Sequence, residues 1–346
     1  MEKTDIRQLE LNQLKKIIAE SGEPEFRAKQ IYEWIWQKSA VNFAEMTNLP
    51  LALRQKLEKA FLFLNIVIES KQESKDGTIK YLFKLFDGTN IEGVLIPSFD
   101  RVTICISSQV GCSLGCDFCA TALLGYKRNL NFDEIYDQVA IMNKESEQIF
   151  GKRISNIVLM GMGEPLLNYP NVIRAIKKIS SPVGLGISPQ RITISTAGIA
   201  HKIKQLADDK INVNLAVSLN TANEKLRVKM MPITKKFPLK DLREAIQYYY
   251  AKTKDIVTIE YIILKGVNDS TADIKMLKDF TRGISVKINL IEYNPIAHSR
   301  YVSPEQDDIM KFKTRLEENR FIVTIRRSKG KDIDAACGQL AGKQLS

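Results

Sequence analysis

Residues 102–119 read VTICISSQVGCSLGCDFC, a strand-like run that leads directly into a loop with three cysteines. Cys112, Cys116 and Cys119 lie within eight residues of one another, which is the spacing of ligands to a metal centre. Three thiolates at this spacing can hold three irons of a 4Fe–4S cluster and leave the fourth iron without a protein ligand. An open iron can bind the amine and carboxylate of a methionine-type ligand. The stretch therefore predicts an iron–sulfur site at the end of a strand.

Two other interpretations of the cysteine loop stay open at this point. A zinc ion would need a fourth ligand, for which His201 and His298 are the candidates, and that ligand would close the site. Alternatively, the three thiols are unrelated small side chains that are simply buried. The spacing favours the open cluster over both.

The chain downstream alternates between strand-like and helix-like segments. Apolar, β-rich runs occupy residues 102–108, 154–163, 191–198, 213–220, 257–264 and 286–294. Between them lie amphipathic segments, in which apolar residues recur at helical spacing, as in residues 132–142 and 239–249. Six β–α alternations predict an α/β fold with a parallel sheet and crossover helices, either a barrel or part of one. In such folds the chemistry lies at the carboxyl ends of the strands.

The chain upstream has a different texture. Residues 1–60 predict helices, and residues 23–38 place Ile31, Trp34 and Ile35 on one helical face. Short β-rich segments follow, separated by hairpin-type turns at Lys75-Asp76-Gly77 and Asp87-Gly88; they are residues 61–69, 79–87 and 90–98. We expect a domain boundary near Pro97, which divides the chain into residues 1–97 and 98–346.

Polar and small residues stand where several of the predicted strands end. The sequence GMGEP, residues 161–165, follows the second strand; its two glycines allow a ligand to approach the backbone, and Glu164 can accept hydrogen bonds from an ammonium group. Ser195, Ser218 and Asn294 end the third, fourth and sixth strands, where each can hydrogen-bond a carboxylate or a ribose.

Composition and charge favour a globular protein with an anionic partner. The 346 residues are 44% hydrophobic and 26% charged, with a formal net charge of +11. Residues 1–100 are nearly neutral, so the positive excess lies in residues 101–346 and favours nucleic acid. Five cysteines and no apolar stretch of signal-peptide or membrane-spanning length argue against a secreted disulfide scaffold and against membrane insertion, so we expect a cytoplasmic location.

The separated motifs resemble one known group of enzymes. The three-cysteine loop, GMGEP, the six β–α units and the sequence DIDAACGQL, residues 332–340, look like the radical S-adenosylmethionine (radical SAM) superfamily, and within it the RlmN-type RNA adenine carbon-2 methyltransferases. The resemblance covers nearly the whole chain. It implies a partial (β/α)6 barrel preceded by a small N-terminal helical domain and a short β extension.

The resemblance also implies an activity. Members methylate carbon 2 of an adenosine in the peptidyl-transferase region of 23S ribosomal RNA, with adenosine in the anticodon loop of some transfer RNAs as a further substrate. That ring carbon is electron-poor and not a nucleophile, so a radical route avoids an unfavourable polar transfer. The resemblance implies a 4Fe–4S cluster, two molecules of S-adenosyl-L-methionine per turnover and a low-potential electron donor such as a flavodoxin. We expect a monomer.

Individual roles follow from the same resemblance. Cys337 carries a methyl group whose methylene radical joins the protein to RNA; Cys105 resolves that adduct, leaving a Cys105–Cys337 disulfide; and Glu92 is the proton acceptor. The implied contacts to S-adenosylmethionine are Gly163, Glu164, Ser195, Ser218, Leu219, Asn220 and Asn294. Asn220 departs from the family pattern, since many relatives have histidine there.

Two alternatives to carbon-2 methylation remain. A sister group, the Cfr type, methylates carbon 8 of the same kind of adenosine, although Pro165 and residues 293–296 look more like the carbon-2 group. A non-catalytic iron–sulfur RNA-binding protein is the other. Any enzyme of this kind must extrude the target base from its stack. Candidate phosphate contacts are the basic residues Lys127, Arg128, Lys229, Lys235, Lys236 and those within residues 326–331.

Overall fold

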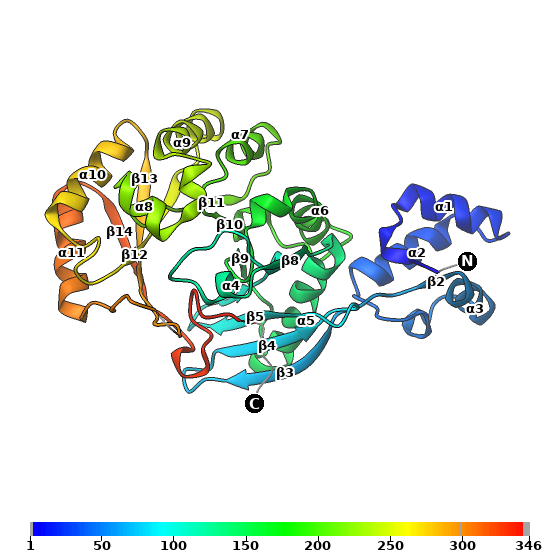
Figure 1. The fold of residues 1–346 in the computed structure, drawn as a ribbon. Coiled ribbons are helices and arrows are strands. Elements are labelled where there is room, and N and C mark those ends of the chain that lie inside the picture. The colour runs from blue at the N-terminus through cyan, green and yellow to red at the C-terminus, as the bar shows by residue number, and fades with distance from the viewer. Residues whose placement is uncertain (1–2, 298, 342–346) are drawn as a thin grey trace.

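The structure is a computed structural model that describes residues 3–297 and 299–341. Figure 1 shows a large body built on one twisted sheet and a small helical body, coloured blue, that is joined to it by an extended segment. The ten strands of the sheet lie in the order β14-β13-β12-β11-β10-β9-β6-β5-β4-β3. The predicted fold class, a partial barrel with an N-terminal helical part and a β extension, is confirmed.

Seven neighbouring strands of this sheet are parallel. They are β6 (Val102–Cys105), β9 (Asn156–Leu159), β10 (Ile192–Thr196), β11 (Asn214–Ser218), β12 (Val257–Ile263), β13 (Val286–Glu292) and β14 (Ile322–Arg326). The first six are the predicted strands. The seventh was missed, because its exposed residues Ile322 and Thr324 give an edge strand that alternates only weakly and runs into a basic segment.

Helices cover the outer face of the parallel strands, as Figure 1 shows. The crossover helices are α5 (Phe132–Phe150), α6 (Tyr169–Ser180), α7 (Ala200–Asp208), α9 (Leu239–Thr253), α10 (Thr271–Thr281) and α11 (Gln306–Glu318), with the shorter α8 (Glu224–Met230) before α9. In α5, Asn131 and Glu134 form a capping box, and Gly151 ends the helix in the left-handed conformation. The apolar stripes predicted for α5 and α9 are buried, so these helices form through packing on the sheet.

The β extension continues the same sheet. Strands β3 (Val67–Glu73), β4 (Ile79–Lys84) and β5 (Asn90–Pro97) form an antiparallel meander, and β5 pairs with β6. The two predicted turns are present, with Gly77 and Gly88 at positive φ. Because β5 and β6, which lie on either side of the boundary predicted near Pro97, are hydrogen-bonded to each other, the β extension is part of the same sheet as the barrel. The division of the chain into two domains at this point stays a prediction.

The helical body comprises α1 (Leu11–Glu20), α2 (Phe26–Trp36) and α3 (Leu51–Ala60). Ile31 and Ile35 are buried as predicted, but Trp36 rather than Trp34 is the fully buried indole. Trp36 packs edge-on against Tyr136 of α5, with ring centroids 4.9 Å apart. The aromatic contact therefore ties the helical body to the barrel.

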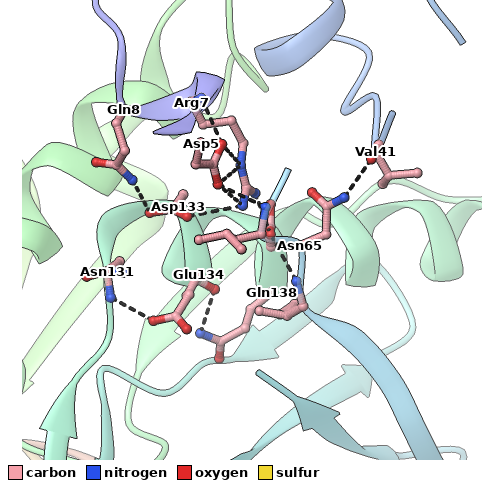
Figure 2. Close-up of polar contacts among 12 residues, drawn as sticks. Asp5, Arg7, Gln8, Val41, Asn65, Asn131, Asp133, Glu134 and Gln138 are labelled. Carbon is pink, nitrogen blue, oxygen red and sulfur yellow. Dashed lines mark hydrogen bonds and ion pairs between the residues drawn. The ribbon is translucent and has the colours of Figure 1, made fainter. Parts of the chain in front are cut away.

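A buried ionic cluster lies at the same interface. Figure 2 shows Arg7 between Asp5 and Asp133, with Gln8 also bonded to Asp133. The Arg7 guanidinium lies 2.9 Å from Asp5 Oδ2, 3.1 Å from Asp133 Oδ2 and 2.7 Å from Asp137 Oδ2. Two of these carboxylates belong to α5, so the cluster links the N-terminal segment to the barrel's first helix.

Within the described ranges, no helix combines the length and the apolar character that crossing a bilayer requires.

Candidate active site

The cysteine loop is held in a short hairpin at the carboxyl end of the first barrel strand. Strands β7 (Gln109–Gly111) and β8 (Tyr126–Asn129) pair antiparallel, and the loop between them contains α4 (Ala120–Leu123). Gly111 has φ +76°, and a Cβ there would lie 1.8 Å from the carbonyl oxygen of Gly125. Glycine is therefore required for the hairpin to close around the cysteines.

The three thiols are partly buried and pack on one apolar cluster. Cys112, Cys116 and Cys119 pack against a buried cluster that includes Phe118, Met230 and Tyr293. Burial raises the pKa of the Cys112 thiol to about 12, and Cys119 adds to that rise. Burial likewise raises the pKa of Cys116, to which the charges of Cys119 and Cys112 contribute, and the pKa of Cys119, to which the charge of Cys337 contributes. The thiols are thus close enough to repel one another as anions.

The loop also offers groups that suit an anionic iron–sulfur centre. Backbone N–H groups of Ser113 and Leu114 point at the Cys112 sulfur, and those of Thr121 and Ala122 point at Cys119. Such hydrogen bonds stabilise thiolates bound to a cluster. The donor set therefore fits a 4Fe–4S cluster held by three cysteines. Among the described residues, no three side chains of the Cys, His, Asp or Glu type stand at the spacing of ligands to a single metal ion.

Sequence reasoning missed the cation beside this loop. Arg227 of α8 is fully buried, and its guanidinium donates to the carbonyls of Ala197, Leu219 and Ser218 and to the hydroxyl of Thr234. Burial lowers the pKa of Arg227 to about 10, opposed by the charges of Cys116 and Glu224. It forms no ion pair within the described part of the chain. A buried cation without a carboxylate partner favours an anionic group nearby.

The GMGEP turn packs tightly on the cysteine-loop hairpin. A Cβ at Gly161 would lie 2.7 Å from the carbonyl oxygen of Ile106, and one at Gly163, where φ is +95°, would lie 2.4 Å from Cβ of Gln109. The backbone amides of Leu166 and Ala197 donate to the two carboxylate oxygens of Glu164. Burial raises the pKa of Glu164 to about 7. The glutamate thus joins the ends of β9 and β10, and each oxygen retains capacity for another donor.

We expect Gly163→Ala to destabilise the protein by about 3 kcal/mol, because it combines a forbidden contact with a strained φ. Gly186→Ala is the matched control, since Gly186 has φ +68° but no atom within 4 Å of the added Cβ. That change should cost about 1 kcal/mol. Urea unfolding measures both. Equal losses in the two variants would mean that the Gln109 contact has no influence.

The serines at the ends of β10 and β11 meet at a carboxylate that the sequence analysis did not single out. Ser195 and Ser218 donate to Oε2 of Glu260 at 2.7 and 3.2 Å. Glu260 lies on β12, and its Oε1 is buried without a hydrogen bond in the described structure. The single charge within the apolar run 257–264 was the available signal, because a carboxylate in a buried strand needs partners.

The remaining predicted ligand contacts have different surroundings. Leu219 is buried, and its carbonyl accepts from Arg227. Asn220 has φ +58°; its Oδ1 accepts from the Ile262 amide, so its side chain bonds within the protein. Asn294 donates to the carbonyl of Cys337 at 3.3 Å, and its buried Oδ1 has no partner among the described residues. Asn294 alone of these three links a strand end to the C-terminal cysteine.

Cys105 and Cys337 line the same cavity, whose volume is about 580 Å³. Arg326, at the end of β14, lines it too and lies 3.9 Å from Glu260 Oε1. Burial raises the pKa of Cys105 to about 12; Cys337 adds to the rise and Arg326 opposes it. Both thiols are free, so the expected Cys105–Cys337 disulfide is not present. That expectation was wrong for this structure, because the two sulfurs are not at bonding distance.

Glu92, the proton acceptor that the resemblance implies, is buried. It lies on β5, where Oε2 accepts from the Ala341 amide at 2.7 Å and Oε1 lies 3.6 Å from Lys80 Nζ. It lines a second cavity, of about 400 Å³, rather than the one shared by Cys105 and Cys337. The structure therefore brings the two cysteines together and places Glu92 across the C-terminal segment from them.

Comparison with known proteins agrees with this geometry over the whole chain. Residues 4–62 match the family described as "Ribosomal RNA large subunit methyltransferase N-terminal domain", and residues 106–277 match the radical SAM superfamily. A probable dual-specificity RNA methyltransferase RlmN from Christiangramia forsetii is 51% identical, over 99% of this chain and 97% of the relative. The chain belongs to the RlmN family of radical SAM RNA methyltransferases.

Other RlmN relatives are similarly full-length matches. The dual-specificity RNA methyltransferase RlmN of Geotalea uraniireducens is 43% identical, over 99% of this chain and 98% of the relative. A crystal structure of a radical SAM methyltransferase from Sphaerobacter thermophilus superposes with a TM-score of 0.93 at 37% identity, covering 98% of this chain and all of that one. The fold is thus shared with a solved relative over nearly the whole of this chain.

Membership of the RlmN family bears on the interpretations of the cysteine loop. Radical SAM proteins use S-adenosylmethionine with a 4Fe–4S cluster, which favours the cluster over the zinc site and the unrelated thiols; the assignment of Cys112, Cys116 and Cys119 as its ligands stays a prediction. Of the two zinc-ligand candidates, His201 packs against Phe237 with the two rings tilted, and burial lowers the pKa of His201, as do Lys202 and Lys236. His298 lies outside the described residues.

The cations proposed for RNA contact fall into two groups. Arg128 pairs with Asp87 and Glu134, Lys331 with Glu292, and Lys329 lies 3.9 Å from Asp76. Arg326 faces the cysteine cavity. By contrast Lys127, Lys229, Lys235 and Lys236 form no ion pair within the described part of the chain. Phosphate binding by residues 326–331 stays a prediction, with several of its charges already engaged.

Proposed function

We propose that this enzyme methylates carbon 2 of an adenosine in 23S ribosomal RNA, in the peptidyl-transferase region, and of an adenosine in the anticodon loop of some transfer RNAs. The names of the full-length relatives, dual-specificity RNA methyltransferases, support two RNA substrates. The observation that carries the proposal is the position of Cys337. It shares a cavity with Cys105, and the next residue, Gly338, accepts from the Ala120 amide of the cysteine loop at 2.7 Å.

In the proposal, one group of residues binds the cluster and another binds S-adenosylmethionine. Cys112, Cys116 and Cys119 would hold the cluster, and the strand ends at Gly163, Glu164, Ser195, Ser218 and Asn294 would bind S-adenosylmethionine. Leu219 and Asn220 would contribute through the backbone of the β11 end. When bound, these cofactors supply the methyl group and the radical that activates it. Two molecules of S-adenosylmethionine per turnover are then needed, because donation of the methyl group and its activation are separate events.

Cys337 acts as the methyl carrier in this proposal. After losing one hydrogen atom to the radical, its methyl carbon would bond to the adenine ring, so protein and RNA are joined transiently; the bond between that carbon and the Cys337 sulfur must then break to release the RNA. Cys105, in the same cavity, acts in releasing the RNA from Cys337. Asn294 holds the carbonyl of Cys337 and so orients the carrier against the strand ends. A cavity lined by Arg326 and Arg327 suits a flipped base with its phosphate nearby.

Glu92 accepts the ring proton in the proposal, as the family resemblance implies. Because Glu92 lines the cavity on the other side of residues 327–341 from Cys105 and Cys337, this role requires that segment to move when RNA binds, and it predicts a specific defect. Glu92→Gln preserves the side-chain size and the contact with the Ala341 amide but removes the base. We expect turnover to fall by about 10²–10⁴-fold while protein covalently joined to RNA accumulates. Denaturing gel electrophoresis of labelled RNA measures the adduct. Normal turnover without adduct would remove Glu92 from the mechanism.

Nucleoside analysis tests the function itself. The protein is reconstituted anaerobically with iron and sulfide and then given S-adenosylmethionine, reductant and unmodified ribosomal or transfer RNA. We expect 2-methyladenosine together with 5′-deoxyadenosine in the mass spectra. The appearance of 8-methyladenosine would move the enzyme to the sister group. Binding of RNA without any methylated nucleoside would favour the non-catalytic alternative.

The cellular setting belongs to the same proposal. We place the enzyme in the cytoplasm, where ribosomal and transfer RNA are modified, and we expect a monomer. A low-potential donor such as a flavodoxin would reduce the cluster.

A further inference from the structure

The C-terminal segment spans the open side of the partial barrel. Residues 327–341 leave β14 at one edge of the sheet and run to β5 and the cysteine loop, as the red ribbon in Figure 1 shows. Near its start, Glu292 of β13 accepts from Lys331 Nζ at 2.9 Å and from the Ser328 amide at 3.4 Å. Near its end, Leu340 O accepts from Thr121 Oγ1. We call residues 327–341 the strap; Cys337 lies within it.

The turn between β3 and β4 grips the middle of the strap from the opposite edge of the sheet. Asp332 of the strap accepts from Ser74 Oγ at 2.5 Å and from the Lys75 amide at 3.1 Å. In return, Asp76 of the turn accepts from the Gly330 amide at 3.0 Å. The strap and the turn thus each contribute one carboxylate acceptor, and each donates hydrogen bonds to the carboxylate of the other. We call residues 74–78 the clasp turn.

The backbone of the strap is shaped for this approach. Gly330 has φ +65°, and a Cβ there would lie 3.0 Å from Thr78 Cγ2 and 2.7 Å from the Ala335 methyl group. Its amide donates to Asp76, while its carbonyl accepts from the Ala335 amide at 2.9 Å. Glycine at this position therefore lets the strap touch the clasp turn and fold back towards Cys337 in one step.

We propose that the clasp turn is a positioning device for the methyl-carrying cysteine: Ser74 and Asp332 fix the strap so that Cys337 faces the cavity it shares with Cys105. This inference rests on the proposed function, in which Cys337 carries the methyl group. Asp332 lies five residues before Cys337, and the clasp is the strap's contact with the β3–β4 edge of the sheet. A carrier that misses its reaction geometry by a fraction of an ångström loses rate even when substrate still binds.

The location of the contacts suits a positioning role better than a role in global stability. Asp332, Lys75 and Asp76 are exposed, whereas Ser74, Thr78 and Gly330 are buried, so the clasp lies at the rim of the buried core. Surface contacts open locally at much lower cost than the sheet unfolds. Hydrogen bonds from Ser74 and Lys75 lower the pKa of Asp332, which keeps its carboxylate charged when the clasp is closed. The charge strengthens both bonds.

The test compares the same chemical change inside and outside the clasp. Asp332→Asn places an amide NH₂ against the Lys75 N–H or the Ser74 hydroxyl, whereas Asp334→Asn alters an exposed carboxylate two residues away for which the described structure has no hydrogen bond. Ser74→Ala removes the hydroxyl of the clasp turn that donates to Asp332. All three are made in the full chain with its cluster reconstituted, and hydrogen exchange of the strap, cluster content, kcat and KM are measured.

We expect Asp332→Asn and Ser74→Ala each to speed exchange in the strap by about tenfold. Each should lower kcat for methylation of Cys337 and of RNA by about tenfold, with KM changed by less than about twofold. The iron content of all three variants should match that of the wild type, and Asp334→Asn should also match it in strap exchange, kcat and KM. The double variant should be no worse than either single one, because both remove the same contact.

Several results would overturn the inference. Unchanged exchange in Asp332→Asn would show that the clasp does not hold the strap, and faster exchange with normal kcat would show that holding it does not position Cys337. Fully additive losses in the double variant would separate Ser74 from Asp332. If wild-type Cys337 is never methylated, the proposed function fails, while the exchange measurements still decide whether the clasp exists.

Discussion

Cys116→Ala should leave the protein unable to retain a 4Fe–4S cluster and unable to methylate RNA. Three thiolates are the whole protein ligand set in the proposed site, so removing one leaves two, too few to hold the cluster with one open iron. After anaerobic reconstitution, we expect the visible absorption of the cluster to be lost and methylation to fall by more than about 1,000-fold. The loss should include methylation of Cys337, since both reactions need the cofactors.

Cys337→Ala is the matched control, because it alters a cysteine outside the loop that contains the ligands. This variant should retain iron, sulfide and visible absorption while losing RNA methylation to the same extent. Iron analysis alongside nucleoside mass spectrometry separates the two losses. A fully loaded cluster in Cys116→Ala would disprove its assignment as a ligand, and RNA methylation by Cys337→Ala would disprove the carrier.

Local patterns in the sequence predicted the parts of the molecule that rest on local physics. The cysteine spacing, the six parallel strands and the stripes of α5 and α9 follow from short-range periodicity, and all of these elements are present. Strand β14 lacked that signal, because an edge strand buries only part of its surface. The pattern within residues 23–38 did not predict that Trp36 is buried, because the residue it packs against, Tyr136, lies a hundred residues further along the chain, on α5.

The missed site residues share a different cause. Ser74 and Asp332 meet across 258 residues, and Ser195 and Glu260 across 65, so no periodicity within either segment predicts the pair. Glu260 did leave a trace: a single carboxylate in an apolar strand must find partners when buried. The same reasoning applies to Glu92, whose role came only from the family resemblance. Arg227 had no such trace, since it is one of four charged residues among the seven of helix α8.

Replacing Arg7 with methionine should cost about 3–5 kcal/mol of stability, the largest loss we expect from a change outside the active site. The Arg7 side chain is 3% exposed, and those of Asp5 and Asp133 are each 2% exposed. Methionine fills a similar volume but leaves three carboxylates, including Asp137, without their cation. Asp5 also accepts from the Leu64 amide, so the segment entering the β extension should loosen too.

The loss should depend on pH. Burial raises the pKa of Asp133 to about 6, although Arg7 opposes the rise; burial raises that of Asp137 as well. A carboxyl whose pKa is higher in the folded state binds its proton more tightly there, so its contribution to stability is greatest at low pH and declines as pH rises through about 6. Without Arg7 both pKa values rise further. We therefore expect the destabilisation by Arg7→Met to be larger at pH 8 than at pH 6.

Arg174→Met provides the comparison, because Arg174 also joins the N-terminal segment to the barrel. Its guanidinium lies 2.9 Å from Glu10 Oε1, but the two side chains are 35% and 53% exposed, so its removal should cost no more than about 1 kcal/mol. Urea unfolding at the two pH values measures both variants. If Arg7→Met were as mild as Arg174→Met, or if its effect were independent of pH, the buried carboxylates would not depend on Arg7, and the aromatic contact of Trp36 with Tyr136 would be left as the principal tie between the helical body and α5.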